Sequence, residues 1–119
     1  KSSDYFASSE GVAQVKGTAL AHPAVDFMGT LMVPVEEVVK ALGGTYAYDE
    51  AVYTASITLN GIQATVKHGN VNYELAGEKK QLSQPCFIVN DLMYVPVEYV
   101  TDVLGAQADV DGICVAFTL

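Results

Sequence analysis

The chain has 119 residues, of which 50% are hydrophobic, so it is long enough for one domain with a sizeable core. Fourteen acidic and six basic residues give a formal net charge of −8. This excludes nucleic acid and anionic membranes as expected partners, because both bind basic surfaces. The apolar runs are far shorter than the roughly 20 residues of a membrane-spanning helix, so we expect no membrane insertion.

The first segment, residues 1–11, reads KSSDYFASSEG and is a polar leader. The remainder, 12–119, is predicted to be a single domain of two pseudo-repeats, about 12–71 and 72–119. Neither half alone would bury enough surface to be stable, so the two are expected to fold as one unit. The chain starts at Lys1 without a charged and then apolar leader. This fits a mature exported protein after signal peptide removal, or an excised fragment.

The repeat is clearest in LMVPVEEVVKALGG, residues 31–44, and MYVPVEYVTDVLGA, residues 93–106, which are identical at seven of fourteen positions. The shared letters are residue types that start, pack and stop a helix, and we predict helices at about 34–42 and 96–104. In each, Pro occupies the first helical position, Glu the first turn and Gly the C-terminal stop. These residues are Pro34 and Pro96, Glu36 and Glu98, and Gly43 and Gly105.

Strands are predicted on either side of each helix, because the hydrophobic period there changes to about 2. Asn60-Gly61 is a favoured two-residue hairpin turn between 52–59 and 62–67, and a further strand follows at 71–75. Met28-Gly29 and Asn90-Asp91 are matching turn positions before the two helices. The predicted fold class is therefore α+β, with an antiparallel sheet wrapped around one short helix in each repeat.

The doubled pattern of a hairpin, VPV, a short helix ending in ALGG or VLGA, and an aromatic-Asp strand resembles the copper amine oxidase N-terminal-like domain. The resemblance covers roughly residues 12–119. In that family the helix usually opens Val-Pro-Leu-Arg and the next strand carries Trp-Asp. Here Glu36 and Glu98 replace the Arg, while Tyr48-Asp49 and Val110-Asp111 replace Trp-Asp. A ligand role that depended on that Arg or Trp would not transfer to this chain.

The resemblance implies a domain exported to the bacterial cell surface and often appended to other domains. It implies no catalysis, no copper and no quinone cofactor, and we expect no enzyme activity, no cofactor and no metal site. The residues give the same expectation. His22 and His68 could join Met28, Met32, Met93 and Cys86 as copper ligands, but their spacing shows no shared face. DVDG, residues 109–112, has only the beginning of a calcium loop.

The two cysteines, Cys86 and Cys114, flank the second helix in apolar segments. Burial would make both thiols inert, so neither is expected to be a nucleophile. An exported setting permits oxidation, and we predict one intramolecular disulfide between them. Nothing in the sequence fixes their Cα separation, which must be under about 7 Å.

Two functions fit these features. The first is an extracellular structural or assembly module, of the fibre or surface-layer type, that self-associates by β-strand addition or binds other cell-envelope proteins. The second is a module that binds wall glycan or a small ligand. The tyrosines to test for ligand stacking are Tyr46, Tyr48, Tyr94 and Tyr99, followed by Tyr53 and Tyr73, although their strand and helix-flank spacing also fits core or rim residues.

The last predicted strand, GICVAFTL, lacks the following hairpin partner that its first-repeat counterpart has. An apolar strand of this kind tends to pair along its free edge. We therefore expect the leader, or the strand beginning at Val12, to cover a sheet edge. It would do so within its own chain or in a neighbouring subunit, and the second arrangement would give a fibre.

Overall fold

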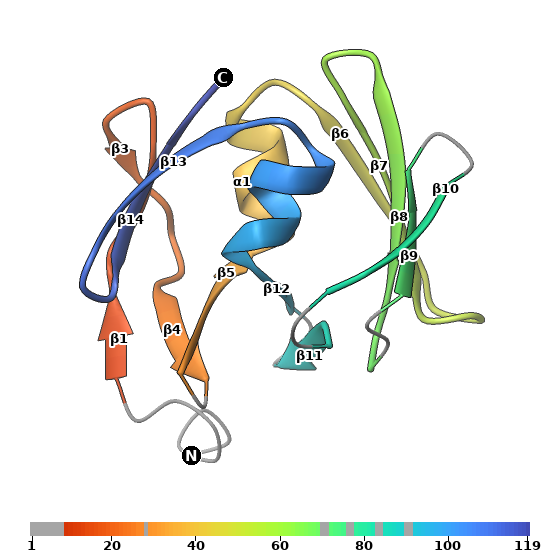
Figure 1. The fold of residues 1–119 in the computed structure, drawn as a ribbon, viewed down its shortest axis with the longest axis horizontal. Coiled ribbons are helices and arrows are strands. Elements are labelled where there is room, and N and C mark those ends of the chain that lie inside the picture. Colours follow the sequence, from red (N-terminus) through yellow and green to blue (C-terminus); the bar gives the residue numbers. More distant parts are fainter. Residues whose placement is uncertain (1–8, 28, 70–71, 76–77, 83–84, 90–91) are drawn as a thin grey trace.

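The computed structural model describes residues 9–27, 29–69, 72–75, 78–82, 85–89 and 92–119. Three sheets surround two short helices (Figure 1). Most of the leader, together with the predicted turn positions Met28 and Asn90-Asp91, lies outside the described residues. The predicted α+β class is confirmed.

The first sheet joins the two repeated segments directly. Its strands are β1 (Ser9–Gly11), β4 (Ala24–Phe27), β5 (Thr30–Pro34), β12 (Leu92–Pro96) and β11 (Phe87–Val89), in that spatial order. At its centre β5 and β12 run antiparallel with Val33 opposite Val95, so the two VPV motifs are neighbours. The β4–β5 and β11–β12 hairpins match the predicted ones. This sheet therefore takes strands from both predicted repeats.

The first helix, α1 (Val35–Ala41), begins one residue later than predicted. Pro34 is not its first residue but its N-cap, and it also ends β5 in an extended conformation. Because proline has no N–H, it completes the strand and leads into the helix without leaving a donor unpaired. The helix buries Val35, Val38 and Val39, and Gly43 follows it at a φ of +94°.

The second helix differs in type from the first. A helical turn at 97–98 continues into η2 (Tyr99–Val103), a π-helix whose end is closed by a bond from the Leu104 N–H to the Tyr99 carbonyl. The prediction of a helix at 96–104 is confirmed in place, but the expectation of a regular α-helix is wrong. Its buried residues are Tyr99, Val100 and Val103, whereas Val97 is only partly buried.

The second sheet is an antiparallel meander that belongs largely to the first repeat. Its spatial order is β10 (Glu78–Gln81), β9 (Asn72–Leu75), β8 (Ile62–Lys67), β7 (Thr54–Leu59) and β6 (Thr45–Asp49). The Asn60-Gly61 hairpin is confirmed, with Leu59 opposite Ile62 and both turn residues at positive φ. Buried and exposed residues alternate along β7, which places Ala55, Ile57 and Leu59 against the helices.

The third sheet combines the two ends of the described chain. Its order is β13 (Gln107–Asp111), β14 (Cys114–Thr118), β2 (Ala13–Val15) and β3 (Thr18–Ala19). β2 runs parallel to β14, whereas the other pairs in this sheet are antiparallel. The prediction that the strand beginning near Val12 covers a sheet edge within its own chain is confirmed.

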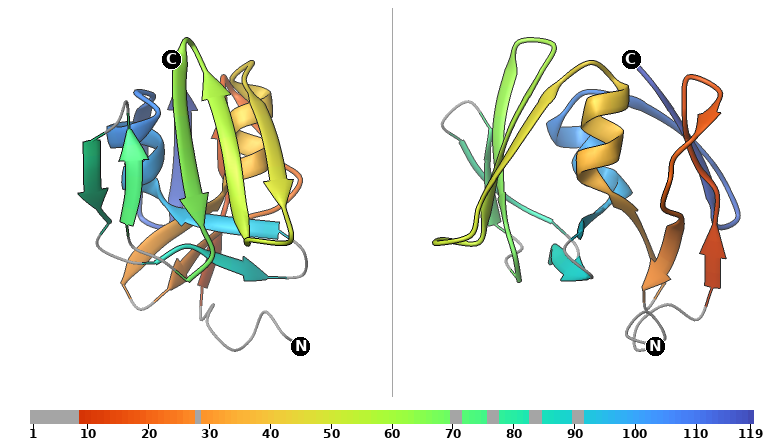
Figure 2. Two further views of the ribbon diagram at one scale, coloured as in Figure 1. Left: turned by 90° about the vertical axis from the view of Figure 1, so that its right-hand side faces the viewer. Right: turned by 180° about the vertical axis from the view of Figure 1, so that it is seen from behind.

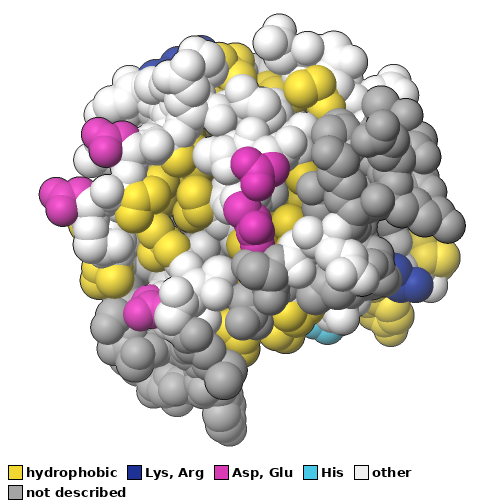
Figure 3. Space-filling view, viewed as in Figure 1, with side chains coloured by type: hydrophobic (Ala, Val, Ile, Leu, Met, Phe, Trp, Pro, Cys, Tyr) yellow, Lys and Arg dark blue, Asp and Glu magenta, His cyan; other side chains and the backbone are white. Residues whose placement is uncertain are grey.

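The core lies between the sheets, where both helices pack (Figures 1 and 2). α1 contacts both β12 and β6, so the first helix bridges elements of both repeats. Acidic side chains stand at the centre and along one side of the face in Figure 3, while lysines lie near its margins. Among the described residues, no helix has the length and apolarity to span a membrane. The predicted division into 12–71 and 72–119 stays a prediction.

Candidate functional site

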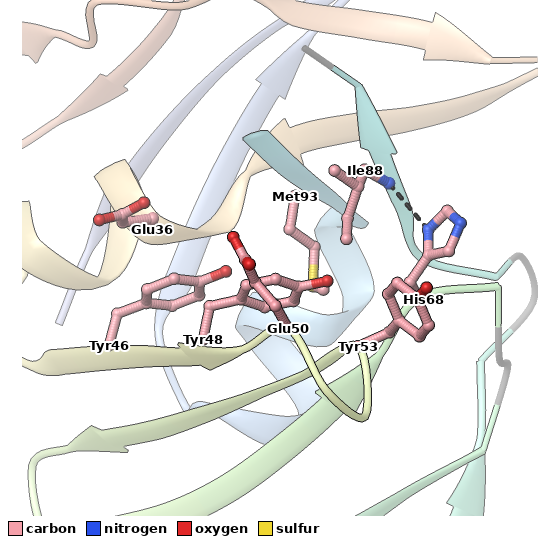
Figure 4. A pocket seen from close by; sticks show the side chains of 8 residues that line it. All are labelled: Glu36, Tyr46, Tyr48, Glu50, Tyr53, His68, Ile88 and Met93. Carbon is pink, nitrogen blue, oxygen red and sulfur yellow. Dashed lines mark hydrogen bonds between the residues drawn. The ribbon is translucent and has the colours of Figure 1, made fainter. Parts of the chain in front are cut away.

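A cavity of about 660 Å³ opens between the edge strand β6, the first turn of α1 and the β11–β12 hairpin. Its lining combines aromatic, acidic and apolar side chains. The lining residues are Glu36, Tyr46, Tyr48, Glu50, Tyr53, His68, Ile88 and Met93 (Figure 4). We call it the tyrosine cavity.

The two central rings come from β6. Tyr46 and Tyr48 alternate with the exposed residues Thr45, Ala47 and Asp49, so both point to the same, inner side of the strand. They are half-buried and pack against the core, and their rings stand beside each other in Figure 4. Because β6 is the edge of its sheet, one side of this aromatic pair stays open to solvent.

The turn between β6 and β7, residues 50–53, carries the outer wall of the cavity. The Asp49 carboxylate accepts a 3.0 Å hydrogen bond from the Ala51 N–H, which orders the start of the turn. Tyr53 ends the turn at a φ of +53°, a left-handed conformation that is costly for an aromatic residue. Its side chain is 56% exposed, so the turn holds a strained, accessible ring at the mouth of the cavity.

His68 stands opposite this turn at the end of β8. Its backbone N–H donates to the Tyr53 carbonyl at 2.9 Å, and the two rings are 6.4 Å apart. Its Nδ1 accepts a 3.0 Å bond from the Ile88 N–H, drawn as the dashed line in Figure 4. Since Nδ1 is the acceptor, the neutral ring carries its proton on Nε2. His68 therefore ties the first-repeat sheet to β11.

Two carboxylates, Glu36 and Glu50, stand beside the tyrosines of the cavity. Burial, the Glu36 carboxylate and the neighbouring Tyr48 raise the pKa of Tyr46 to about 12. Desolvation, followed by the Glu50 carboxylate, also raises the pKa of Tyr48. Glu36 is paired with Lys40 at 2.6 Å across one helical turn, but this pair is largely exposed and is therefore weak. Both phenols stay protonated at neutral pH.

Residues 13–115 match the protein family described as the copper amine oxidase N-terminal domain. The chain belongs to this family. The match covers most of the chain and the eight described residues that line the tyrosine cavity, while β1 lies outside it. A search of the curated proteins found no match.

In a copper amine oxidase, the N-terminal domain is a non-catalytic domain of a larger protein. Among the described residues of this copper amine oxidase N-terminal domain, no three His, Cys, Asp or Glu side chains lie together where they could hold a metal ion. Asp109 and Asp111 are on β13, and Gly112 turns the β13–β14 hairpin. The backbone N–H of His22 donates to Glu37 at 3.0 Å and its Nδ1 contacts the same carboxylate, far from His68 in the chain.

Two of the four candidate stacking tyrosines belong to the core of the domain instead. Tyr94 is 5% exposed, and its hydroxyl donates to the Pro23 carbonyl at 3.1 Å. Tyr99 is 0% exposed, and its hydroxyl donates to the Thr65 carbonyl at 3.2 Å. Neither ring is among the described residues that line the tyrosine cavity, so Tyr46 and Tyr48 are the two of these four that remain available to a ligand.

The two cysteines of the domain are free in the structure, so the predicted bridge is not formed there. Cys86 is fully buried next to β11, and burial raises the pKa of its thiol to about 12. Cys114 begins β14 and is exposed, so the expectation that both thiols are buried is wrong for Cys114.

Glu50 and His68 complete the cavity, yet sequence patterns gave them no shared role. The sequence feature that could have pointed to them is a difference in hairpin length between the predicted repeats. Asp49 pairs with Thr54 across four turn residues, whereas the equivalent Asp111 pairs with Cys114 across two. The two additional residues make room for Glu50 and Tyr53 at the mouth of the cavity.

A second candidate site is the segment from β1 to β3, residues 9–19, which we call the N-terminal clip. It pairs with β4 through β1 and with β14 through β2. The Val115 N–H donates to the Val12 carbonyl and the Lys16 N–H to the Phe117 carbonyl, both at 3.0 Å. Ala13 and Val15 reach the main core. The clip thus completes two sheets of the domain.

Proposed function

We propose that this domain is a non-catalytic structural module of the cell exterior that joins neighbouring chains by β-strand addition, with the N-terminal clip as the donated segment. The observation that carries the proposal is the parallel pairing of β2 with β14. Strand addition uses such edge pairing for affinity and alternate side chains for specificity. Placement outside the cell is supported by the resemblance to exported surface domains.

The contacts of the clip suit a segment that is exchanged. Its pairing partners are strand edges, and only alternate residues of β2, Ala13 and Val15, enter the core. The backbone at Gly11 passes so close to the β13–β14 turn that an added Cβ would lie 1.8 Å from the Ile113 carbonyl oxygen. A clip from a neighbouring chain would make the same contacts.

Exchange of the clip between chains produces an open assembly. The donating segment and the accepting groove beside β14 are different surfaces, so the contact is heterologous, and successive additions do not close unless the rotation happens to close a ring. The expected product is a fibre or a sheet of subunits. In the monomer the clip occupies its own groove, and exchange leaves the strand pairing unchanged.

The test is a cysteine pair across β2 and β14. Gln14 lies opposite Ala116 in the parallel register, and both are partly exposed on the same face. Gln14→Cys with Ala116→Cys is made in a Cys86→Ala, Cys114→Ala background and oxidised. Exchange predicts a ladder of covalent multimers on a non-reducing denaturing gel, because each bridge then joins two chains. Bridges found only within monomers would contradict it.

The matched control pairs Gln14→Cys with Ser56→Cys, which is exposed on β7 in a different sheet. It should give no ladder. Deletion of residues 1–11, which removes β1, provides a second measurement by light scattering and electron microscopy. Exchange predicts fewer polymers with the body still folded. A monomer that is unchanged before and after the deletion rejects the assembly proposal.

The tyrosine cavity favours a second candidate function, a binding module for wall glycan or a small ligand. The supporting observation is the pair Tyr46 and Tyr48 on the open edge strand β6, beside acidic groups that accept hydrogen bonds. NMR titration with a wall oligosaccharide tests the glycan form. We expect saturable chemical-shift changes confined to β6 and the 50–53 turn. If the highest oligosaccharide concentration causes no such changes, the glycan form is rejected.

A further inference from the structure

Among the described residues that line the tyrosine cavity, the charged groups are Glu36 and Glu50, and both are acidic. Lys40 pairs with Glu36 from the helix surface, with its own side chain 59% exposed. These two carboxylates would repel an anionic ligand and attract a cation.

His68 lies beside these carboxylates. Its Nδ1 accepts the Ile88 N–H at 3.0 Å. The imidazole is fixed by this bond between β8 and β11. It can offer a cation its ring face and its position beside Tyr53, with ring centroids 6.4 Å apart.

The remaining surface is aromatic and apolar. Tyr46, Tyr48 and Tyr53 present rings, whose faces are the negative ends of their quadrupoles and attract cations. Met93 and Ile88 form an apolar floor between β12 and β11 (Figure 4). Calcium takes six to eight oxygen ligands. The described lining offers two carboxylates among aromatic and apolar side chains, which suits a cation that carries alkyl groups better.

We propose that the tyrosine cavity binds a small organic ammonium ion, with its alkyl groups against Tyr46, Tyr48 and Met93 and its charge between Glu36 and Glu50. The inference rests on the second candidate function, ligand binding, and names the ligand class. It is independent of strand addition. The strained φ of +53° at Tyr53 serves this arrangement by keeping a third ring at the mouth.

The probe is choline, and its control is 3,3-dimethyl-1-butanol, which has the same shape without the charge. Both are titrated into isotopically labelled protein at low salt and followed by NMR. Choline should give saturable shifts in β6 and the 50–53 turn, weakened by added salt because the carboxylates are exposed. The neutral alcohol should bind at least about tenfold more weakly. Equal binding of the two compounds overturns the proposal.

Substitutions locate the site. Tyr48→Leu should weaken choline binding by about 2- to 30-fold, the range of one cation–π contact, while Tyr48→Phe should keep the affinity. Glu50→Gln, in an exposed turn where folding is not at risk, should also weaken it. Glu98→Gln is the matched control, since Glu98 occupies the position of Glu36 in the second repeat, outside the cavity. Affinities unchanged by both Tyr48→Leu and Glu50→Gln overturn the proposal.

Titrations with a wall oligosaccharide and with choline distinguish glycan binding from binding of an ammonium ion. A wall oligosaccharide that shifts β6 while choline does not would overturn the ammonium site and leave ligand binding intact. If neither compound causes saturable shifts, both the ammonium site and the ligand-binding candidate are rejected. The strand-addition proposal is tested separately, because its readout is the size of the particle.

Discussion

The similar segments 31–44 and 93–106 are identical at seven of fourteen positions and yet build different helices. α1 is a regular helix that buries Val35, Val38 and Val39, whereas η2 is a π-helix that buries Tyr99, Val100 and Val103. The position of Tyr99 is occupied in α1 by Glu37, which faces His22 at the surface. A wider helical turn rotates the buried stripe by about one residue, and a large ring then enters the core.

The strands after the helices differ in the same way. Tyr46 and Tyr48 on β6 correspond to Ala108 and Val110 on β13. The first repeat therefore leaves an aromatic cavity at its edge strand. The second repeat has a tighter hairpin and receives the N-terminal clip along β14. The shared residues position the helices, and the residues that differ give one edge strand an aromatic cavity and the other a pairing with the N-terminal clip.

Tyr99→Ala should cause the largest loss of stability, because it removes the ring that distinguishes η2 from α1. A fully buried aromatic truncated to alanine costs about 3–5 kcal/mol of the free energy of unfolding. Tyr99→Phe removes only the hydroxyl bonded to the Thr65 carbonyl and should cost about 0.5–1.5 kcal/mol. Urea titrations measure both. Equal costs would mean that the hydrogen bond, and not the packing, dominates.

Gly11→Ala should release the N-terminal clip from the second repeat. Its new Cβ would lie 1.8 Å from the Ile113 carbonyl oxygen, and overpacking of this kind typically costs about 1–3 kcal/mol. Hydrogen exchange should accelerate at the Val115 amide, which bonds the Val12 carbonyl. Gly17→Ala is the control, since φ there is +84° but nothing lies within 4 Å. It should destabilise through backbone strain alone.

Stability should fall above pH 9 because of Cys86. The pKa of its thiol is raised from 9.0 to about 12 by burial, so between these values the unfolded chain has lost the proton and the folded chain has kept it. The free energy of unfolding therefore decreases as pH rises, with a slope approaching about 1.4 kcal/mol per pH unit. Below pH 9 this contribution is constant.

Cys86→Ala is the control, because it introduces the residue that the first repeat has at Ala24. It should flatten the alkaline decline relative to the parent protein. Tyr46, with a pKa of about 12, contributes equally to both proteins above pH 10 and cancels in the comparison. Thiol titration of the native protein should find Cys114 reactive and Cys86 protected. If the unreduced, denatured protein has no free thiols, the two cysteines are bridged after all.

Lys40→Asp should have the smallest effect. It gives α1 the residue that the second repeat has at Asp102, and it replaces the 2.6 Å pair with Glu36 by a like-charge pair. Helical pairs of this spacing contribute about 0.2–0.5 kcal/mol, and like charges cost a similar amount. Lys40→Gln should lose only the attraction. A larger loss for the glutamine variant than for the aspartate variant would contradict this account.

Local patterns predicted the parts of the fold that depend on neighbouring residues. The Asn60-Gly61 turn and the VPV helix starts are examples, since hairpin and cap geometry is decided within a few positions. The π-helix at Tyr99–Val103 was not predictable, because the space available to the Tyr99 ring is set by β8, far along the chain. For β2, the sequence predicted that the strand would cover a sheet edge, but it did not predict that the pairing would be parallel.

Local patterns also predicted part of the candidate site. Tyr46 and Tyr48 were identifiable from their alternation on one strand. Their partners Glu50 and His68 come from a turn and a strand end, and only the folded chain brings them together. Tyr94 and Tyr99 share the same chemistry but are buried, because packing, and not residue type, decides which rings meet solvent.

The pairing of β2 with β14 also governs the order of folding. Val12 and Cys114, which contact each other beside this pair, are separated by 102 positions, whereas the hairpins of the β6–β8 meander close locally. Local hairpins form in microseconds, and distant pairing waits for a costly loop closure. During synthesis at about 5–20 residues per second, β2 therefore remains without β14 for about 5 to 20 seconds. The groove for β2 forms only once β14 has been made, so until then β2 has no pairing partner there in its own chain.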